Sequence, residues 1–355
     1  MIDYLDTIPY ILLLCLLLFN LTINTRKSNN LCFFILFVFS AIRYDVGFDY
    51  MMYLDILRYE PDYDRFEFLE YVLQRFAAKT YIPIFFIVNS FITVYFAKWA
   101  IEKLSANVSI SLLAFLCLPL LYTHSLSIIR FWSGVSVLFY ATTFLYEKKW
   151  IHFAVLYIIS YFIHGSMVVG ILFIPLVLFK ISRTVNIILL IFSFIGGEFL
   201  FNGILGASLG DYGILGQRLN YYVKIATTEN GMTKIPYLYL ATDILFLILW
   251  PRKNNNKSSA VLHKYITIFN IGVCILFLFS FDNTLNSRLC RPFLIYIILV
   301  VPLILKHLRG EKRRISTFAF TLAASALFIY TITIYNDTLG KSEYLPYRII
   351  FLENY

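Results

Sequence analysis

The sequence predicts an all-α, polytopic integral membrane protein, and three observations support that prediction. Hydrophobic residues make up 60% of the 355 residues and charged residues only 14%, whereas soluble domains carry about 25% charged residues. The mean hydropathy is +0.74. Apolar runs of about 20 residues, the length that crosses a bilayer as a helix, recur along the chain. A soluble globular enzyme is therefore excluded, and we expect one membrane domain over residues 1–355.

Basic residues gather in six linkers between the apolar runs. The linkers are TRK, KWAIEK, EKK, KISR, PRKNNNK with the following HK, and KHLRGEKRR. They hold 17 of the 30 basic residues but only 3 of the 21 acidic ones. Because lysine and arginine mark the cytoplasmic side of a membrane protein, all six linkers are expected inside and both termini outside. The net charge of +9 then reflects the inner linkers, and nucleic-acid binding is not implied.

The apolar runs predict about 12 transmembrane helices. Single spans are expected at residues 8–25, 30–46, 81–101, 108–124, 127–146, 185–201, 236–250, 264–281, 288–306 and 314–335. The stretch 151–179 lies between two inner linkers, EKK and KISR, so it must cross an even number of times. We expect two short helices, each about 21 Å long, that meet at His164, Gly165 and Ser166 below the outer surface. The start of the chain lacks a basic n-region and a cleavage site, so a retained first helix is expected.

The first outer segment, residues 43–80, is larger than a connector needs to be. Its apolar residues Phe66, Leu69, Val72, Leu73 and Phe76 fall on one helical stripe. Asp64 and Glu67 resemble a capping box ahead of that stripe. The pattern predicts an amphipathic helix that lies on the outer leaflet.

The second outer segment, residues 202–235, is rich in glycine and tyrosine. It holds six glycines together with Tyr212, Tyr221 and Tyr222. Two interpretations remain open from the sequence. The segment is either a flexible connection or a loop that folds over a polar ligand.

Seven cationic or imidazole side chains lie at the outer ends of spans, where the charge rule makes them unexpected. They are Arg43, Arg130, His164, Arg218, Arg288, Arg291 and Arg348. Such side chains either extend to the outer headgroups or face a cavity inside the protein. A planar guanidinium suits phosphate and carboxylate, so the second interpretation predicts a site for an anionic ligand that arrives from the outer leaflet.

Several segments resemble the EpsG branch of the Wzy-type polysaccharide polymerases. IRYDVGFDYMMY is similar to the first signature of that family, and SLSIIRFWSGVSVLFYA is similar to its later arginine-bearing helix start. YFIHGSMVVGILFIPL, NSRLCRPFLIY and YLPYRIIF match further elements in family order. Phe48, Phe131 and Gly165 stand where the family usually has threonine, glutamine and lysine.

The resemblance implies an O-antigen or related polymerase of the bacterial inner membrane, with its active site facing the periplasm. The outer side, where the charge rule places both termini, is then the periplasm. Such enzymes transfer a growing glycan from undecaprenyl pyrophosphate to the non-reducing end of another lipid-linked repeat unit. The donor and acceptor are membrane lipids that carry oligosaccharides. The usual partners are the chain-length regulator, flippase and ligase of the same pathway.

The chemistry of this transfer assigns roles to the candidate residues. Arginines stabilise the departing pyrophosphate, and a carboxylate or imidazole takes a proton from the acceptor hydroxyl. The predicted catalytic residues are Arg43, Asp45, Asp49, Arg130, His164 and Arg288. The predicted substrate-binding residues are Tyr44, Gly47, Tyr50, Tyr53, Ser166, Arg218, Arg291, Tyr347 and Arg348. The general base is left open among Asp45, Asp49 and His164, which could also have structural roles.

No ligand cluster for a metal and no cofactor motif occurs in the sequence, so we expect neither a metal nor a cofactor. Three other functions compete with polymerisation. A flippase for lipid-linked oligosaccharides would also gather arginines, but in a central cavity between related halves. An O-antigen ligase shares the donor. A membrane O-acyltransferase would need an early histidine and arginine pair, which this chain lacks.

Overall fold

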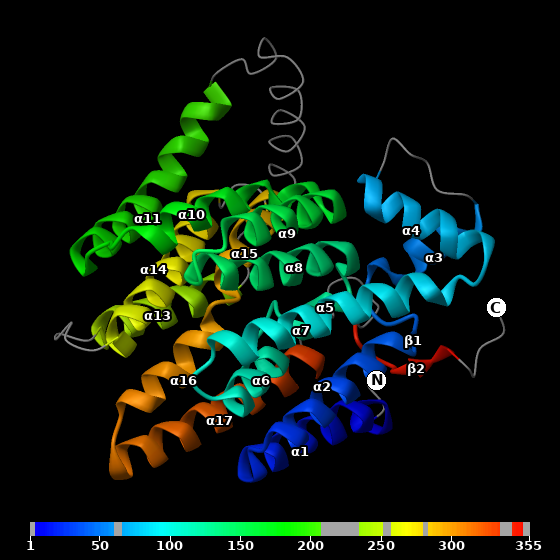
Figure 1. Ribbon diagram of the computed structural model, residues 1–355, viewed down its shortest axis with the longest axis horizontal. Helices are drawn as coiled ribbons and strands as arrows, with labels where there is room; N and C mark the ends of the chain where they lie inside the picture. The colour runs from blue at the N-terminus through cyan, green and yellow to red at the C-terminus, as the bar shows by residue number, and fades with distance from the viewer. Residues whose placement is uncertain are drawn as a thin grey trace. The chain divides into compact units, whose positions relative to one another are not determined.

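The computed structural model describes residues 4–59, 66–206, 234–250, 257–279, 283–333 and 343–350 (Figure 1). The described chain is almost entirely helical, as predicted. The helices are α1 (Ile8–Ile23), α2 (Arg26–Ala41), α3 (Asp49–Arg58), α4 (Phe68–Lys79), α5 (Pro83–Leu104), α6 (Val108–Cys117), α7 (Tyr122–Ser125), α8 (Ile129–Tyr146), α9 (Trp150–Ile163), α10 (Phe173–Leu178), α11 (Arg183–Gly206), α13 (Lys234–Ile248), α14 (Lys257–Leu278), α15 (Asn283–Leu294), α16 (Ile297–His307) and α17 (Gly310–Thr333). Two 3-10 helices, Tyr4–Thr7 and Gly165–Leu172, and two short strands, β1 (Arg43–Tyr44) and β2 (Arg348–Ile349), complete the described elements.

Within the described ranges, five helical stretches are long and apolar enough to cross a membrane. They are Leu5–Ile23, Pro83–Leu104, Ser258–Leu278, Asn286–His307 and Gly310–Thr333. Five shorter apolar helical stretches accompany them: Val108–Cys117, Trp150–Ile163, Gly165–Leu178, Arg183–Gly197 and Ile235–Ile248. The chain is therefore an all-α protein of the membrane type. The count of 12 spans and the outer location of both termini stay predictions.

The chain divides into two compact units. Unit 1 comprises residues 1–168 and 301–355, and unit 2 comprises residues 169–300. Most of the outer-end residues singled out in the sequence belong to unit 1. Arg218, Arg288 and Arg291 belong to the sequence range of unit 2.

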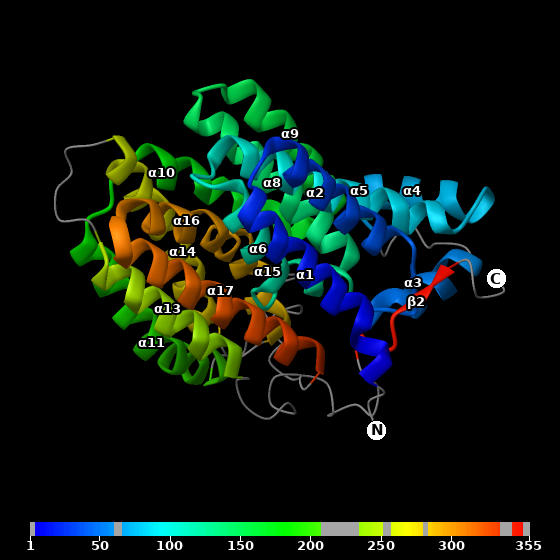
Figure 2. The same ribbon diagram turned by 90° about the horizontal axis from the view of Figure 1, so that it is seen from below.

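In unit 1, helix α8 packs between α5 and α9 (Figures 1 and 2). Small and hydroxylated residues line their contacts. Ser133 of α8 donates to Asn89 Oδ1 of α5 at 2.6 Å. A Cβ at Gly134 would lie only 3.1 Å from the Met167 side chain and 3.4 Å from His164 Cβ. Such small residues let helices in a membrane pack closely, so α8 holds the segment after α9 in place.

The segment between the EKK and KISR linkers breaks at His164, as the sequence predicts. Helix α9 ends at Ile163, and His164 is extended at φ −153° and ψ 120°. The 3-10 helix Gly165–Leu172 and the short α10 follow. The break places the His164 side chain where two helical pieces meet.

Helix α4 presents its apolar residues outward and its polar residues to the protein. Phe68, Val72 and Phe76 are half exposed, whereas Glu70 is 2% and Gln74 0% exposed. This inverted pattern suits a helix whose outer face meets lipid. The expected capping box is not formed on Glu67, because Glu67 itself stands at the N-cap position and makes no side-chain cap bond. Asp64 lies outside the described residues.

The C-terminal segment joins the first outer motif. Strand β2 pairs antiparallel with β1, so that Tyr44 lies opposite Arg348. The Tyr347 hydroxyl donates to the Phe39 carbonyl at 2.7 Å, and its ring stacks on Phe39 with centroids 4.2 Å apart. The Tyr10 hydroxyl donates to the backbone carbonyl next to this strand, that of Tyr344, at 2.6 Å. Residues 343–350 are thereby fixed to the ends of α1 and α2.

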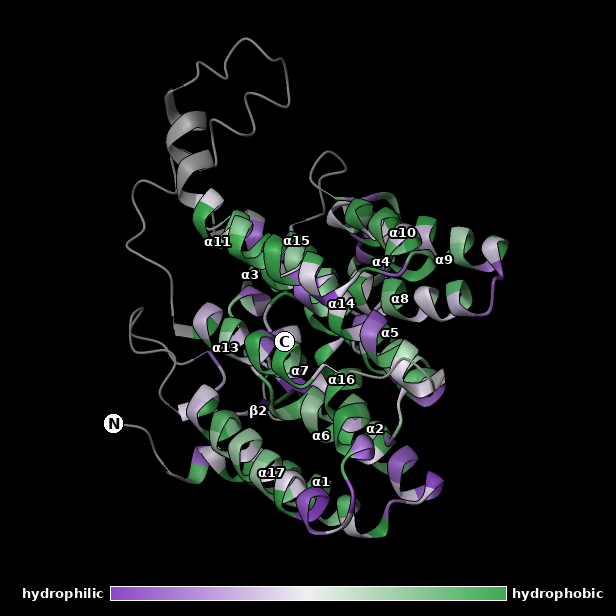
Figure 3. Ribbon diagram, turned by 90° about the vertical axis from the view of Figure 1, so that its left-hand side faces the viewer, coloured by the Kyte–Doolittle hydropathy of each residue, from purple (hydrophilic) through white to green (hydrophobic). Residues whose placement is uncertain are grey.

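Three of the basic linkers lie at one end of unit 1. Ser109 of α6 donates to Asn24 Oδ1 at 2.7 Å and to Asn29 Oδ1 at 2.8 Å. Lys103, which precedes α6, forms an ion pair with Glu147 at 3.2 Å. Figure 3 shows hydrophilic residues concentrated at the helix ends and hydrophobic residues along the helix bodies. The Arg130 end of α8 is separated from the Glu147 end by the length of that helix, about 27 Å.

In unit 2, helix α14 packs against α11, α13 and α15. Polar side chains pair within this packing. Asn270 donates to Asp243 Oδ2 at 2.6 Å, and Asn186 donates to the Thr267 hydroxyl at 3.1 Å. Both asparagines and Asp243 are fully buried, and pairing reduces the cost of burying them among apolar helices.

Candidate functional site

An arginine, a carboxylate, a tyrosine and an imidazole meet at the outer-motif end of unit 1. Arg130, in the first turn of α8, forms an ion pair with Glu67 Oε2 at 2.8 Å. Its Nε donates to the Tyr53 hydroxyl at 2.9 Å. Glu67 Oε1 accepts the backbone N–H of Gly165 at 2.7 Å, the residue that follows His164. We call Arg130, Tyr53, Glu67 and His164 the Arg130 cluster.

Contacts within the protein orient the Arg130 guanidinium but do not satisfy all of its hydrogen-bond donors. Its side chain keeps 13% exposure. The Phe66 ring lies 4.5 Å from its guanidinium carbon. Tyr53 and Glu67 hold Nε and Nη1, and Nη2 has no hydrogen-bond partner among the described residues. A fixed arginine with one remaining donor edge is suited to binding an anion.

Glu67 is an ionised carboxylate in this arrangement. Burial alone would raise its pKa, but the hydrogen bond from the Gly165 N–H and the charge of the Arg130 guanidinium hold the pKa below its usual value. Its side chain remains 28% exposed. Each carboxylate oxygen is held by one donor and keeps a further lone pair for another hydrogen bond.

His164 is 7% exposed and packs edge-on against Phe131 with centroids 5.3 Å apart. Its Nδ1 accepts the backbone N–H of Ser166 at 3.2 Å. In the neutral ring this bond places the proton on Nε2. The geometry therefore favours His164 as a hydrogen-bond donor over a base. Ser166 contributes to this hydrogen bond through its backbone N–H.

Arg43 differs from Arg130 because all three of its nitrogens bind protein groups. The side chain is 1% exposed. Nε donates to the Val46 carbonyl at 3.3 Å, and Nη2 donates to the Leu126 carbonyl at 3.3 Å. Nη1 donates to the Ser40 carbonyl and to the Ser90 hydroxyl. In this structure Arg43 ties the first outer motif to the start of α8.

The backbone around Arg43 is shaped by Gly47. Gly47 has φ +95°, a conformation that side chains rarely adopt, and a Cβ there would overlap the Leu126 carbonyl. Its N–H donates to the Glu343 carbonyl at 2.8 Å. The Ser127 hydroxyl donates to the Glu343 side chain. The C-terminal segment, the first motif and the loop before α8 thus converge within a few residues of Arg130.

The remaining predicted residues of the first motif surround this point. Asp45 has φ +49° and is half-buried. Asp49 stands in the first turn of α3 and interacts electrostatically with Tyr53. Tyr50 is fully buried and stacks on Phe86 at 4.1 Å, with the Tyr44 ring edge-on to it at 5.7 Å. Arg348 is exposed on β2, next to the half-buried Tyr347.

Unit 1 therefore brings together the predicted residues from 43 to 53, Arg130, His164, Ser166, Tyr347 and Arg348. Arg288 and Arg291 lie on α15 in unit 2, where Arg291 is 5% exposed. Arg218 lies outside the described residues. The convergence of these three arginines on the Arg130 cluster stays a prediction, as does the direct contact of any of the named residues with substrate.

Comparison with a family model shows to which protein family the chain belongs. The EpsG family model matches residues 28–349. The chain belongs to the EpsG family. No curated protein and no solved structure matches the chain. All predicted site residues fall inside the range matched by the EpsG family, from Arg43 to Arg348.

The structure of this EpsG-family chain adds two carboxylates that the sequence did not single out for the site. Glu67, which the sequence suggests as part of a capping box, pairs with Arg130, and Glu70 accepts a hydrogen bond from Asn89. A signal was present. Glu67, Glu70 and Gln74 form a polar stripe opposite the apolar one, and polar groups of membrane helices face the protein. In the described part of the chain, no group of three potential metal ligands comes together.

The buried carboxyl of Glu70 is expected to make the folding stability of the protein depend on pH. Burial raises its pKa to about 7, although Arg130 and Asn89 oppose that shift. A carboxyl whose pKa is raised by folding binds a proton more tightly when folded, so stability falls as pH rises from about 4.5 to about 7. Glu67, with its lowered pKa, stays ionised over this range. Glu70→Gln should flatten the pH dependence of the thermal unfolding midpoint of detergent-purified protein between pH 5 and 8. An unchanged slope would contradict the assignment.

Proposed function

We propose that the chain is a polysaccharide polymerase that joins lipid-linked oligosaccharide units at the periplasmic face of the bacterial inner membrane. The growing glycan leaves undecaprenyl pyrophosphate and is transferred to the non-reducing end of another lipid-linked unit. The Arg130 cluster, in a chain of the EpsG family, carries this proposal. It combines a held cation, an ionised carboxylate and an imidazole at the end of α8 remote from the basic linkers.

Arg130 is assigned to the leaving group. As the anomeric C–O bond breaks, its electron pair and negative charge pass to the pyrophosphate oxygen. Tyr53 and Glu67 fix the guanidinium before the reaction, so the remaining Nη2 edge meets the developing charge without reorganisation. A preorganised arginine supplies this stabilisation without a metal.

Glu67 is assigned to the acceptor. The acceptor hydroxyl must lose its proton as its oxygen bonds to the anomeric carbon, and a carboxylate within about 3 Å can take that proton. Glu67 is ionised, partly exposed and oriented by the Gly165 N–H. Asp45 and Asp49 remain alternative bases. His164, with its proton on Nε2, is assigned to hydrogen-bond donation to the donor phosphate or a sugar hydroxyl.

Arg43 is assigned as a positioning residue. It fixes the loop that precedes α8 through the Leu126 carbonyl, four residues before Arg130. The chain-length regulator, flippase and ligase of the same pathway are proposed as partners, and no cofactor is required by this chemistry.

Glycan laddering in cells tests the proposal. Deletion of the gene should leave surface glycan with a single repeat unit, and expression of the wild-type chain should restore the ladder of longer chains. Complete loss of surface glycan in the deletion strain would instead favour a flippase or a ligase. An unchanged ladder would exclude a role in chain extension.

Cysteine labelling tests the orientation of unit 1. In a cysteine-free background, Tyr59→Cys should react with an impermeant thiol reagent in intact spheroplasts, because this side chain is 84% exposed beside α3 at the proposed outer end. Lys149→Cys, which is 55% exposed in the EKK linker, should react only after lysis. The reverse pattern would place the Arg130 cluster on the wrong side for this chemistry.

Chelation tests the metal-free mechanism. Purified protein should continue to extend lipid-linked units in excess chelator, because Arg130 carries the charge of the leaving pyrophosphate. Loss of activity that magnesium or manganese restores would contradict this account. It would also make Asp45 and Asp49 candidate metal ligands.

A further inference from the structure

A basic cavity in unit 2 has no role in the proposed transfer reaction. It has a volume of about 450 Å³ and lies between the end of α10, the start of α11, the end of α13 and the first turns of α14. Its charged or imidazole lining residues are Lys180, Arg183, His263 and Lys264. None of the residues that line it is acidic. The cavity therefore concentrates positive charge without internal neutralisation.

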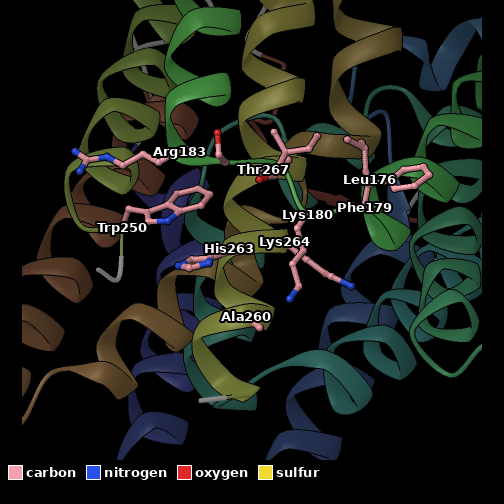
Figure 4. Close-up of a pocket in the computed structure, with 11 residues that line it drawn as sticks. Leu176, Phe179, Lys180, Arg183, Trp250, Ala260, His263, Lys264 and Thr267 are labelled. Carbon is pink, nitrogen blue, oxygen red and sulfur yellow. The ribbon is translucent and has the colours of Figure 1, made fainter. Parts of the chain in front are cut away.

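Two cationic side chains of this cavity, those of Lys180 and Lys264, interact electrostatically. Figure 4 shows the side chains of Lys180 and Lys264 projecting in the same direction. Lys264 donates to the Val177 carbonyl at 2.5 Å, and the charges of the two lysines repel each other. Arg183 extends away from these two lysines (Figure 4). An anion that contacts both lysine ammonium groups would relieve the repulsion between them.

The cavity wall combines this charge with aromatic and apolar surface. Trp250 stacks on His263 with ring centroids 4.4 Å apart. Tryptophan is a residue type enriched at membrane–water interfaces. Phe179, a further lining residue, is 65% exposed. Along the adjoining helix α11, Val185, Ile188 and Phe192 are also exposed. A ligand with a charged head and apolar chains fits this surface better than a soluble anion does.

We propose that this cavity binds the phosphate headgroup of an anionic membrane lipid of the leaflet that faces the KISR linker. Its acyl chains lie along the exposed side of α11. Basic pockets between transmembrane helices on the cytoplasmic side are suited to such headgroups. The site is independent of the Arg130 cluster and does not depend on the proposed polymerase function.

Native mass spectrometry of the full-length, delipidated protein tests the site. Dioleoyl phosphatidylglycerol should bind at least about tenfold more tightly than dioleoyl phosphatidylcholine. Each lysine near a membrane surface contributes about fivefold to such binding, so Lys180→Gln should weaken phosphatidylglycerol binding by about that factor. Lys180 is exposed, and its replacement should not disturb folding. The double variant Lys180→Gln/Lys264→Gln should lose the preference.

Lys312→Gln is the matched control, because Lys312 is an exposed lysine of another basic linker and does not line the cavity. It should leave binding of both lipids unchanged. Equal affinity for the two lipids would overturn the proposal, as would an unchanged preference in the Lys180→Gln and double variants. Binding of inorganic phosphate that depends on Lys180, without preference for phosphatidylglycerol, would also overturn it and indicate a soluble phosphate ester.

Discussion

Replacing Arg130 by lysine is expected to lower the rate of glycan extension by about 10²–10³-fold, the usual cost of losing one preorganised contact to a developing anion. Lysine keeps the charge but replaces the planar fork by a single ammonium. It cannot hold Tyr53, Glu67 and the leaving pyrophosphate in the directions that Nε, Nη1 and Nη2 now provide. The measurement is the rate of chain extension by purified protein on lipid-linked units, together with the glycan ladder in cells.

Arg75→Lys is the matched control for this prediction. Arg75 on α4 also donates to a tyrosine hydroxyl, that of Tyr71, at 2.7 Å, and lies over the same ring. The pair is exposed and lies outside the Arg130 cluster. Arg75→Lys should therefore extend chains at the wild-type rate. If Arg130→Lys accumulates normally and also makes chains of normal length at normal rate, Arg130 does not contact the leaving group.

The break at His164 could be predicted because it depends on properties local in sequence. The stretch 151–179 is too long for one span, and the basic linkers on both sides require an even number of crossings. The structure places the end of α9 one residue before His164. Span length and charge are read directly from residue types, so they need no tertiary information.

The partner of Arg130 could not be predicted in the same way. Glu67 is 63 positions away from Arg130 in the chain. A glutamate just before a helix can serve either as a helix cap or as a salt-bridge partner. The choice depends on how α4 packs against α9 and α5, which is a tertiary property. The polar stripe of Glu67, Glu70 and Gln74 indicates which face of α4 meets the protein. It does not identify the arginine that pairs with Glu67.

Arg43 and Arg130 show the same limit. Both stand at the outer end of a predicted span, and the sequence predicts that both stabilise the leaving pyrophosphate. A guanidinium binds backbone carbonyls and phosphate oxygens with the same donors, so residue type alone does not separate a ligand contact from a structural one. The structure separates them by exposure, 1% for Arg43 and 13% for the side chain of Arg130.

Arg43→Lys is therefore expected to act on stability where Arg130→Lys acts on rate. A lysine cannot reach the Val46, Ser40 and Leu126 carbonyls together, and each buried acceptor left without a donor costs about 1–3 kcal/mol. With two of them unsatisfied, we expect a loss of about 3 kcal/mol. The measurements are the unfolding midpoint of the purified protein and its amount in the membrane.

Arg348→Lys provides the control for Arg43→Lys. Arg348 lies on β2, directly across from the residue after Arg43, but its side chain is exposed. Its replacement should leave the unfolding midpoint unchanged. The folded fraction of Arg43→Lys should still extend chains, because Arg43 positions the start of α8 and does not bind the leaving group. A variant that accumulates and unfolds like the wild type but makes no polymer would instead place Arg43 in contact with substrate.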